Sequence, residues 1–137
     1  MNNDQVAAMD AVKGFLYDYA KKDVESCMTA IASSKPILLM GTNDNEIFGS
    51  AADVREAFGR DFSNMDDIRW GEVRHARAET SGELASVIIE LPVSFRTDGD
   101  EVETLFRYAL TLVRENGRWK ICSGIASVPF KSGTYTF

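Results

Sequence analysis

The pattern of hydrophobic and polar positions changes from a helical period to a strand period near residue 65. Between Asp4 and Ala20, apolar side chains recur at spacings of three and four, which is typical of an amphipathic helix. Asn2 or Asn3 can cap the first turn of this helix. Asp23 can cap a second, shorter helix that follows it. The first 31 residues therefore predict two helices.

A proline and a polar turn separate these helices from a third. Pro36 cannot continue a helix, and the apolar run 37–40 after it predicts a short buried strand. Residues 41–45 have turn composition, and residues 46–49 can return as a brief hairpin strand. Ser50 then begins a capping pattern for the third helix. The apolar face of that helix consists of Val54, Ala57, Phe58 and Phe62.

The rest of the chain alternates with a period of two and predicts an antiparallel meander. Turn signals divide it into strands at residues 68–79, 84–97, 101–115 and 118–128. Asp98-Gly99 and Asn116-Gly117 are strong hairpin signals because glycine tolerates a positive φ. We expect an α+β, cone-shaped fold in which three N-terminal helices pack on a strongly curved antiparallel sheet. We also expect one domain spanning residues 1–137.

Strand alternation predicts which side chains face the core. Phe106, Tyr108, Leu110 and Leu112 share one face of their strand, and Trp119, Ile121, Ser123 and Ile125 share one face of the last. Pro92 cannot donate a ladder hydrogen bond, so it predicts a bulge or a local edge. Three helices cannot fill a concave sheet of this length, and we therefore expect an internal pocket.

Composition and charge exclude several classes of function. The net charge is −6, with 15 Lys plus Arg against 21 Asp plus Glu and no basic run, so nucleic acid and anionic membranes are not expected partners. No apolar run approaches the length of a membrane span, and the polar start lacks signal-peptide features, which favours a cytoplasmic protein. Cys27 and Cys122 match no metal or redox spacing and are expected as buried free thiols. We expect neither a metal nor a cofactor.

The order of these elements resembles the SnoaL-like branch of the nuclear transport factor 2-like superfamily. The more specific matching segments are 41–49 with the helix after it and 117–121 on the closing strand. The resemblance covers nearly the whole chain. It implies a pocket between helices and sheet and a homodimer formed through the sheet face. Members include isomerases, cyclases, dehydratases, epoxide hydrolases and proteins without enzymatic activity, so the resemblance leaves the function open.

Two departures from the family weaken an enzymatic interpretation. Similar sequences often carry two histidines on the closing strand, where Ser123 and Ile125 stand here. Ketosteroid isomerase-like members carry a general-base carboxylate on the strand after the second helix, where this chain has Leu39 and Met40.

A few polar residues remain as catalytic candidates. Under regular strand parity, Glu72 and Arg74 share the face of Trp70 and could enter the pocket as a charged pair. The alternative is a structural or solvated ion pair. Tyr17 lies on the first helix, where isomerase-like members use a tyrosine as an oxyanion donor, although it could simply pack in the fold or at the pocket rim. His75, the only histidine, has the opposite parity and is expected to point outward.

The expected pocket walls are aromatic or apolar, with few polar groups. Tyr108, Ser123 and Glu46 could reach the cavity, and Glu46 could instead only fix its turn. The predicted binding residues are Met40, Phe48, Phe58, Phe62, Trp70, Phe106, Tyr108, Trp119 and Ser123.

Three functional hypotheses follow. The first is a homodimeric protein that binds a small hydrophobic or aromatic ligand. The second is a metal-free isomerase, cyclase or hydrolase with Glu72 or Glu46 as base, Arg74 beside it, and Tyr17 or Tyr108 as oxyanion donor. The third is an association module that uses the outer sheet face at Ser86, Ile88, Glu90, Ser94 and Arg96.

Overall fold

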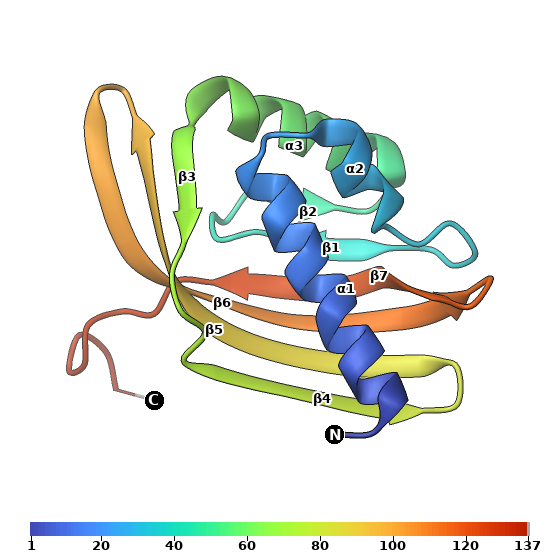
Figure 1. The fold of residues 1–137 in the computed structure, drawn as a ribbon. Coiled ribbons are helices and arrows are strands. Elements are labelled where there is room, and N and C mark those ends of the chain that lie inside the picture. The colour runs from blue at the N-terminus through green and yellow to red at the C-terminus, as the bar shows by residue number, and fades with distance from the viewer. Residues whose placement is uncertain (137) are drawn as a thin grey trace.

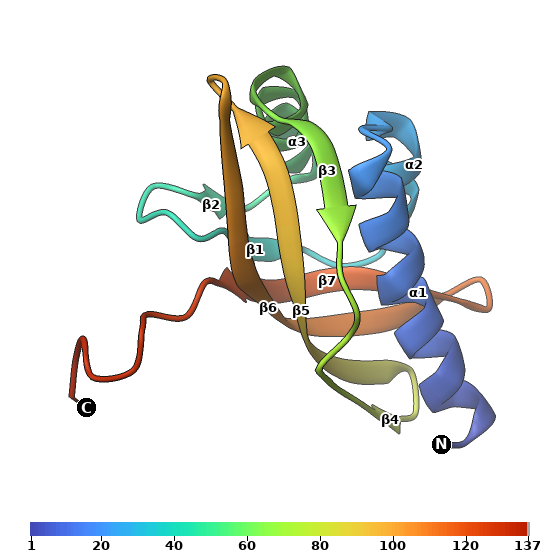
Figure 2. The same ribbon diagram turned by 60° about the vertical axis from the view of Figure 1, so that its left-hand side comes forward.

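Three helices and a seven-stranded curved sheet form the computed structural model, which describes residues 1–136 (Figure 1). The elements are α1 (Asn3–Ala20), α2 (Val24–Thr29), β1 (Leu38–Met40), β2 (Ile47–Phe48), α3 (Ala51–Asn64), β3 (Asp66–Trp70), β4 (His75–Ser81), β5 (Leu84–Thr97), β6 (Asp100–Glu115) and β7 (Arg118–Ser127). The predicted α+β class is confirmed, and α1 crosses the concave face of the sheet (Figure 2).

The helices start where their capping residues predict. Asn2 accepts a hydrogen bond from the backbone N–H of Gln5, whose side chain accepts one from the backbone of Asn2 in return. Asp23 caps α2, and Ser50 caps α3. Each cap satisfies a backbone donor that has no partner inside its helix.

The sheet is mixed, because one parallel pair joins the predicted antiparallel meander. Its strand order is β2-β1-β7-β6-β5-β3, and β4 also pairs with β5. β1 lies parallel to β7, with Leu38 opposite Ser123 and Met40 opposite Ile125. A tight hairpin forces two strands to pair antiparallel. No hairpin links β1 to β7, which lies far from it in the sequence, so the two strands can pair in parallel.

The predicted strand at 68–79 is two strands, which pair with successive parts of β5. Residues 71–74 between them lie outside both strands. The backbone N–H of Gly71 donates to the carbonyl of Pro92 at 2.8 Å. The N–H and C=O of a strand residue point to the same side. The missing N–H of Pro92 would therefore also face the gap between β3 and β4. Pro92 thus occupies a local interruption of the ladder.

An irregularity at Cys122 reverses the faces of the second half of β7. Leu112 lies opposite Ile121, but Thr111 lies opposite Ser123, so Cys122 is an extra residue. One extra residue exchanges the two faces of a strand. Ser123 and Ile125 therefore share the outer face, and their predicted inward direction is wrong.

Gly124 takes the inward position after the irregularity. A Cβ at this residue would lie 2.5 Å from the carbonyl oxygen of Ala109 and 2.5 Å from a methyl carbon of Leu110. Only glycine therefore allows β7 to approach β6 this closely.

The core fills the space between α1 and the long strands. Val12, Val87, Ile89 and Leu112 are fully buried there. Cys27 and Cys122 are buried and free, and burial raises the pKa of Cys27 to about 12, so this thiol stays protonated at neutral pH. No helix within residues 1–136 is long and apolar enough to cross a membrane.

Candidate functional site

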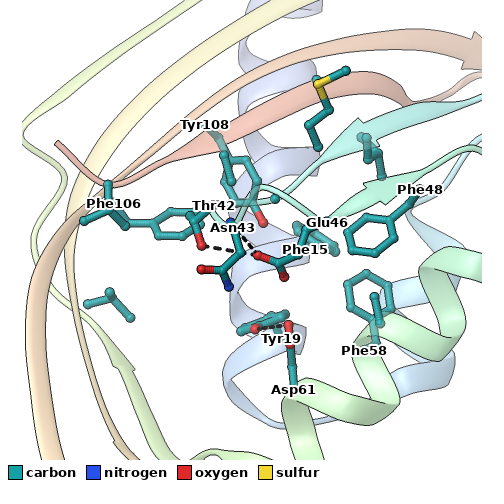
Figure 3. A pocket seen from close by; sticks show the side chains of 18 of the residues that line it. Phe15, Tyr19, Thr42, Asn43, Glu46, Phe48, Phe58, Asp61, Phe106 and Tyr108 are labelled. Atoms are coloured by element: carbon teal, nitrogen blue, oxygen red, sulfur yellow. Dashed lines mark hydrogen bonds between the residues drawn. The ribbon is translucent and has the colours of Figure 1, made fainter.

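A cavity of about 650 Å³ lies between α1, α3, the bent sheet and the turn after β1 (Figure 3). Most of its wall is apolar. Eight aromatic side chains contribute to it: Phe15, Tyr19, Phe48, Phe58, Trp70, Phe95, Phe106 and Tyr108. Its volume lies within the usual range for small-molecule sites.

Element geometry places these rings together. Phe15 and Tyr19 are four residues apart on α1 and so lie on one helix face. Phe106 and Tyr108 are two residues apart on β6 and point to the same side of the sheet. Phe15 contacts Phe58 of α3, with ring centroids 5.8 Å apart, so helices and sheet share one aromatic wall.

Tyr19 and Asp61 form a polar pair within this wall. The Tyr19 hydroxyl donates to Asp61 Oδ2 at 2.7 Å, and the Tyr19 ring meets Phe62 edge-on with centroids 5.0 Å apart. Burial raises the pKa of Asp61, and the Glu46 charge raises it further, while the Tyr19 hydrogen bond opposes both. Burial and the Asp61 charge raise the pKa of Tyr19. Asp61 therefore takes up a proton more readily than an exposed aspartate, and Tyr19 stays a neutral phenol.

Glu46 is held by the turn that precedes it. Its Oε1 accepts the backbone N–H of Asn43 at 2.7 Å, and the Gly41 N–H donates to the Glu46 carbonyl at 2.8 Å. A Cβ on Gly41 would lie 2.8 Å from the Glu46 Cβ, so glycine is needed for the Glu46 side chain to fold over this turn. The carboxylate consequently faces the cavity (Figure 3).

Tyr108 supplies the third polar group of the interior. Its ring packs against Phe106, with centroids 4.8 Å apart, and its hydroxyl points into the cavity (Figure 3). Burial raises the pKa of Tyr108. No residue within 1–136 hydrogen-bonds this hydroxyl, so it is available to a ligand.

Six of the nine predicted binding residues line the cavity: Met40, Phe48, Phe58, Trp70, Phe106 and Tyr108. The other three lie elsewhere. Phe62 packs behind the wall, stacked on Phe58. Trp119 is buried, and the Arg114 Cζ atom lies over its ring, 4.5 Å from the ring centroid. Ser123 lies on the opposite sheet face, for the reason given above.

The structure does not bring Glu72, Arg74 or Tyr17, the catalytic candidates, into the cavity. Regular strand parity fails for Glu72 and Arg74 because the chain leaves the strand after Trp70. Both are exposed, and Arg74 borders a separate hollow beside Pro92. Tyr17 is 64% exposed on α1, where Lys21 lies 4.9 Å from its ring centroid.

Tyr19 and Asp61, whose side chains meet in the cavity wall, are not among the residues that the sequence predicts for the site. The spacing of Tyr19 fits the apolar stripe of the first helix, so its hydroxyl gives no signal in the pattern. Asp61 lies three residues after Phe58 and four after Ala57, which also places it on the apolar face of α3. A carboxylate at an apolar-stripe position was the signal that could have identified it.

This chain is similar in sequence to one protein family and in fold to several solved structures. A family model described as a SnoaL-like domain matches residues 8–131. A comparison with curated protein sequences found no significant match. Two similar solved structures come from Streptomyces avermitilis and Erwinia carotovora atroseptica. The first is a provisionally named dehydratase of the nuclear transport factor 2-like family, with a TM-score of 0.85, 14% identity, and coverage of 93% of this chain and 97% of the other.

The second is a ketosteroid isomerase-like protein, with a TM-score of 0.80, 15% identity, and coverage of 96% and 100%. A provisionally named calcium/calmodulin dependent protein kinase II association domain from Xanthomonas campestris has a TM-score of 0.74, 15% identity, and coverage of 90% and 85%. At these identities the likeness shows the fold alone.

The raised pKa of Asp61 predicts a pH-dependent effect of Asp61→Asn on stability. The native state keeps the Asp61 proton to a higher pH than the unfolded chain, so wild-type stability falls as pH rises through that interval. Asn removes this penalty and can still accept the Tyr19 hydrogen bond. We expect Asp61→Asn to raise the melting temperature at pH 7 and to lose that advantage near pH 3.

Thermal unfolding followed by circular dichroism at both pH values measures this difference. Asp44→Asn, at an exposed position of the turn after β1, is the matched control and should change neither value. A variant less stable than wild type at pH 7 but not at pH 3 would show that the ionised Asp61 stabilises the fold.

Proposed function

Because the chain belongs to the SnoaL-like domain family of the nuclear transport factor 2-like superfamily, we propose that it binds a small hydrophobic or aromatic molecule in its cavity. The aromatic wall of the roughly 650 Å³ cavity carries this proposal. Flat apolar ligands are stabilised by such walls through burial and ring contacts. Polar groups fix the ligand's orientation, and the unpaired Tyr108 hydroxyl is the first candidate for that contact.

Reducing the cavity volume should weaken ligand binding without unfolding the protein. Ala57 of α3 lines the cavity, so Ala57→Phe would place a ring in the ligand space. Ala52→Phe, on the exposed side of the same helix, is the matched control. We expect Ala57→Phe to weaken binding by at least about tenfold, which is about 1.4 kcal/mol.

Fluorescence titration with the neutral naphthalene probe prodan measures both affinities, and circular dichroism verifies folding. Equal affinities for the two variants would locate binding outside the cavity.

Cofactor-free proton transfer is a second candidate, favoured by the Tyr19–Asp61 hydrogen bond beside Glu46. In a dehydration, Glu46 would remove a proton from the carbon next to a carbonyl, while Tyr108 stabilises the resulting oxyanion. Asp61 would protonate the departing hydroxyl, so that a C=C bond forms and water leaves. The dehydratase and isomerase names of the similar structures support this chemistry class.

A β-hydroxy ketone tests that candidate. With 4-hydroxy-4-phenylbutan-2-one as substrate, we expect the conjugated enone to appear and to be detected by its ultraviolet absorbance. Glu46→Gln should reduce the rate by about 10²-fold or more. Glu72→Gln, which changes an exposed carboxylate away from the cavity, should keep the wild-type rate. Absence of turnover in the wild type on this substrate and its ring-substituted analogues would contradict the candidate.

The outer sheet face favours a homodimer. By strand register, Ile88, Ala109 and Ile125 form one row across β5, β6 and β7, and Ile88 and Ile125 are 56% and 49% exposed. An exposed apolar row on a sheet is typical of an association surface. The Arg107 guanidinium binds the Glu90 carboxylate at 2.7 Å beside this row. The association-domain name of one similar structure also supports pairing through this fold.

A charge in this row should separate the two copies. We expect wild-type protein to sediment as a dimer at micromolar concentration and Ile88→Glu to sediment as a monomer, because the carboxylate would be desolvated in the contact. Val6→Glu changes an equally apolar but distant surface of α1 and should leave the dimer intact. A monomeric wild type would contradict a dimer through this face.

A further inference from the structure

The cavity is unevenly charged. Glu46, Asp61 and Glu103 contribute carboxyl groups to its lining, and none of the described lining residues is Lys, Arg or His. Glu103 is exposed, whereas Asp61 and Glu46 face the interior (Figure 3). Buried carboxylates in proteins are normally paired with a cation. In this cavity the partner of Asp61 is a neutral phenol, and the partners of Glu46 are the Asn43 backbone amide and the Thr42 hydroxyl.

The neighbouring cation Arg60 does not fill this role. Arg60 precedes Asp61 on α3 and lowers its pKa, but less than burial raises it. The Arg60 guanidinium is exposed and pairs with Glu56 at 3.3 Å. The charge needed to balance the two interior carboxylates is thus not supplied by this helix.

The aromatic wall is suited to a cation. Rings attract a positive charge placed over their faces at distances up to about 6 Å. Phe15, Tyr19 and Phe58 pack against one another in the wall beside Asp61, with centroid separations of 6.4 Å for Phe15–Tyr19, 5.8 Å for Phe15–Phe58 and 6.2 Å for Tyr19–Phe58. A small ammonium group among these rings would combine ring attraction with charge pairing.

The free acceptors fit an ammonium group. Tyr19 binds Asp61 Oδ2, which leaves Oδ1 for a ligand. The Tyr108 oxygen has no hydrogen-bond partner within residues 1–136, and its lone pairs can accept an N–H. With Glu46 these groups present three acceptors, and a primary ammonium has three donors. All three face the same space (Figure 3).

An organic cation fits this setting better than a metal ion. The described residues contain no group of three or more His, Cys, Asp or Glu that could hold a metal ion. The rest of the wall is apolar, which suits the hydrocarbon body of an amine. The net charge of −6 also attracts cations at long range.

We infer that the cavity recognises a small molecule that carries a protonated amine on an aromatic or aliphatic body, with the ammonium held by Asp61, Glu46 and Tyr108. The inference rests on the proposed ligand-binding function and adds the charge class of the ligand. Neutral and anionic ligands of the same shape would lack the ion pair, and an anion would be repelled.

Three ligands of nearly equal shape test this inference: 1-naphthylmethylamine, 1-naphthylmethanol and 1-naphthoate. Calorimetric titration at pH 7 should show the amine binding at least about tenfold more tightly than the alcohol, and the naphthoate binding most weakly. Asp61→Asn and Glu46→Gln should each remove most of the preference for the amine while leaving the affinity for the alcohol within about twofold.

Two controls separate a local effect from net charge and from misfolding. Glu83→Gln removes the same charge from an exposed turn outside the cavity and should keep the amine preference. The two cavity variants replace carboxyls in different elements, so one remains informative if the other unfolds.

Acidification gives an independent readout. Burial and the Glu46 charge raise the pKa of Asp61, and the Tyr19 hydrogen bond and the Arg60 charge lower it by less. As the pH decreases, Asp61 therefore loses its charge at a higher pH than an exposed aspartate. The amine affinity should therefore fall early as pH decreases, whereas the alcohol affinity should remain constant.

The possible outcomes distinguish the two proposals. Equal binding of amine and alcohol would overturn the amine inference and leave the ligand-binding function standing. Binding of none of the three would overturn the amine inference and also count against the ligand-binding function. An amine preference retained in both Asp61→Asn and Glu46→Gln would overturn the assignment of the carboxyls.

Discussion

The unbroken pairing of β5 with β6 is the constraint on which the cavity depends. The two strands remain in register from Leu84 opposite Val113 to Thr97 opposite Asp100. β4 covers one half of the other edge of β5 and β3 covers the other half, and the change of partner occurs at Pro92. The long pair bends there, and α1 contacts both β4 and β3 while α3 lies beyond the end of α1 (Figure 1).

The polar groups of this space come from separate elements that the fold brings together. Tyr19 ends α1, Asp61 lies on the apolar stripe of α3, Glu46 follows a glycine turn, and Tyr108 is central in β6. Burying Asp61 costs free energy, which its raised pKa records. Groups that cost stability and share one cavity are typical of functional sites, because an apolar residue would satisfy the packing at lower cost.

Sequence periodicity predicted the elements better than it predicted the site. The capping residues placed all three helices, and the glycine turns placed the hairpins. The apolar stripes also supplied most of the aromatic wall. The errors in the predicted site arose where the chain departs from the regular alternation of a strand. The chain leaves the strand after Trp70, which removes Glu72 and Arg74 from the cavity, and the extra residue at Cys122 turns Ser123 outward.

Tyr19 and Asp61 were missed for a different reason. Residues on the apolar stripe of a helix are expected to pack in the core, and the aromatic ring of Tyr19 is compatible with such packing. Asp61 is not apolar, yet the spacing of α3 places this residue between Phe58 and Phe62 on the same helix face. The hydrogen bond between the two side chains depends on the packing of α1 against α3, which no local pattern contains. Polar residues that interrupt an apolar stripe are therefore better site candidates than polar residues that alternate along an exposed strand.

The proposed specificity of the cavity depends on its polar groups more than on its apolar wall. At 14–15% identity the fold is retained with TM-scores of 0.74 to 0.85, so the architecture tolerates replacement of most side chains. Walls of any large apolar residues can maintain such a space. A carboxylate or phenol inside it, by contrast, changes which charge a ligand can bring. The balance of Asp61, Glu46 and Tyr108, with no cationic residue among the described residues that line the cavity, is therefore the property by which we propose that this chain selects a ligand.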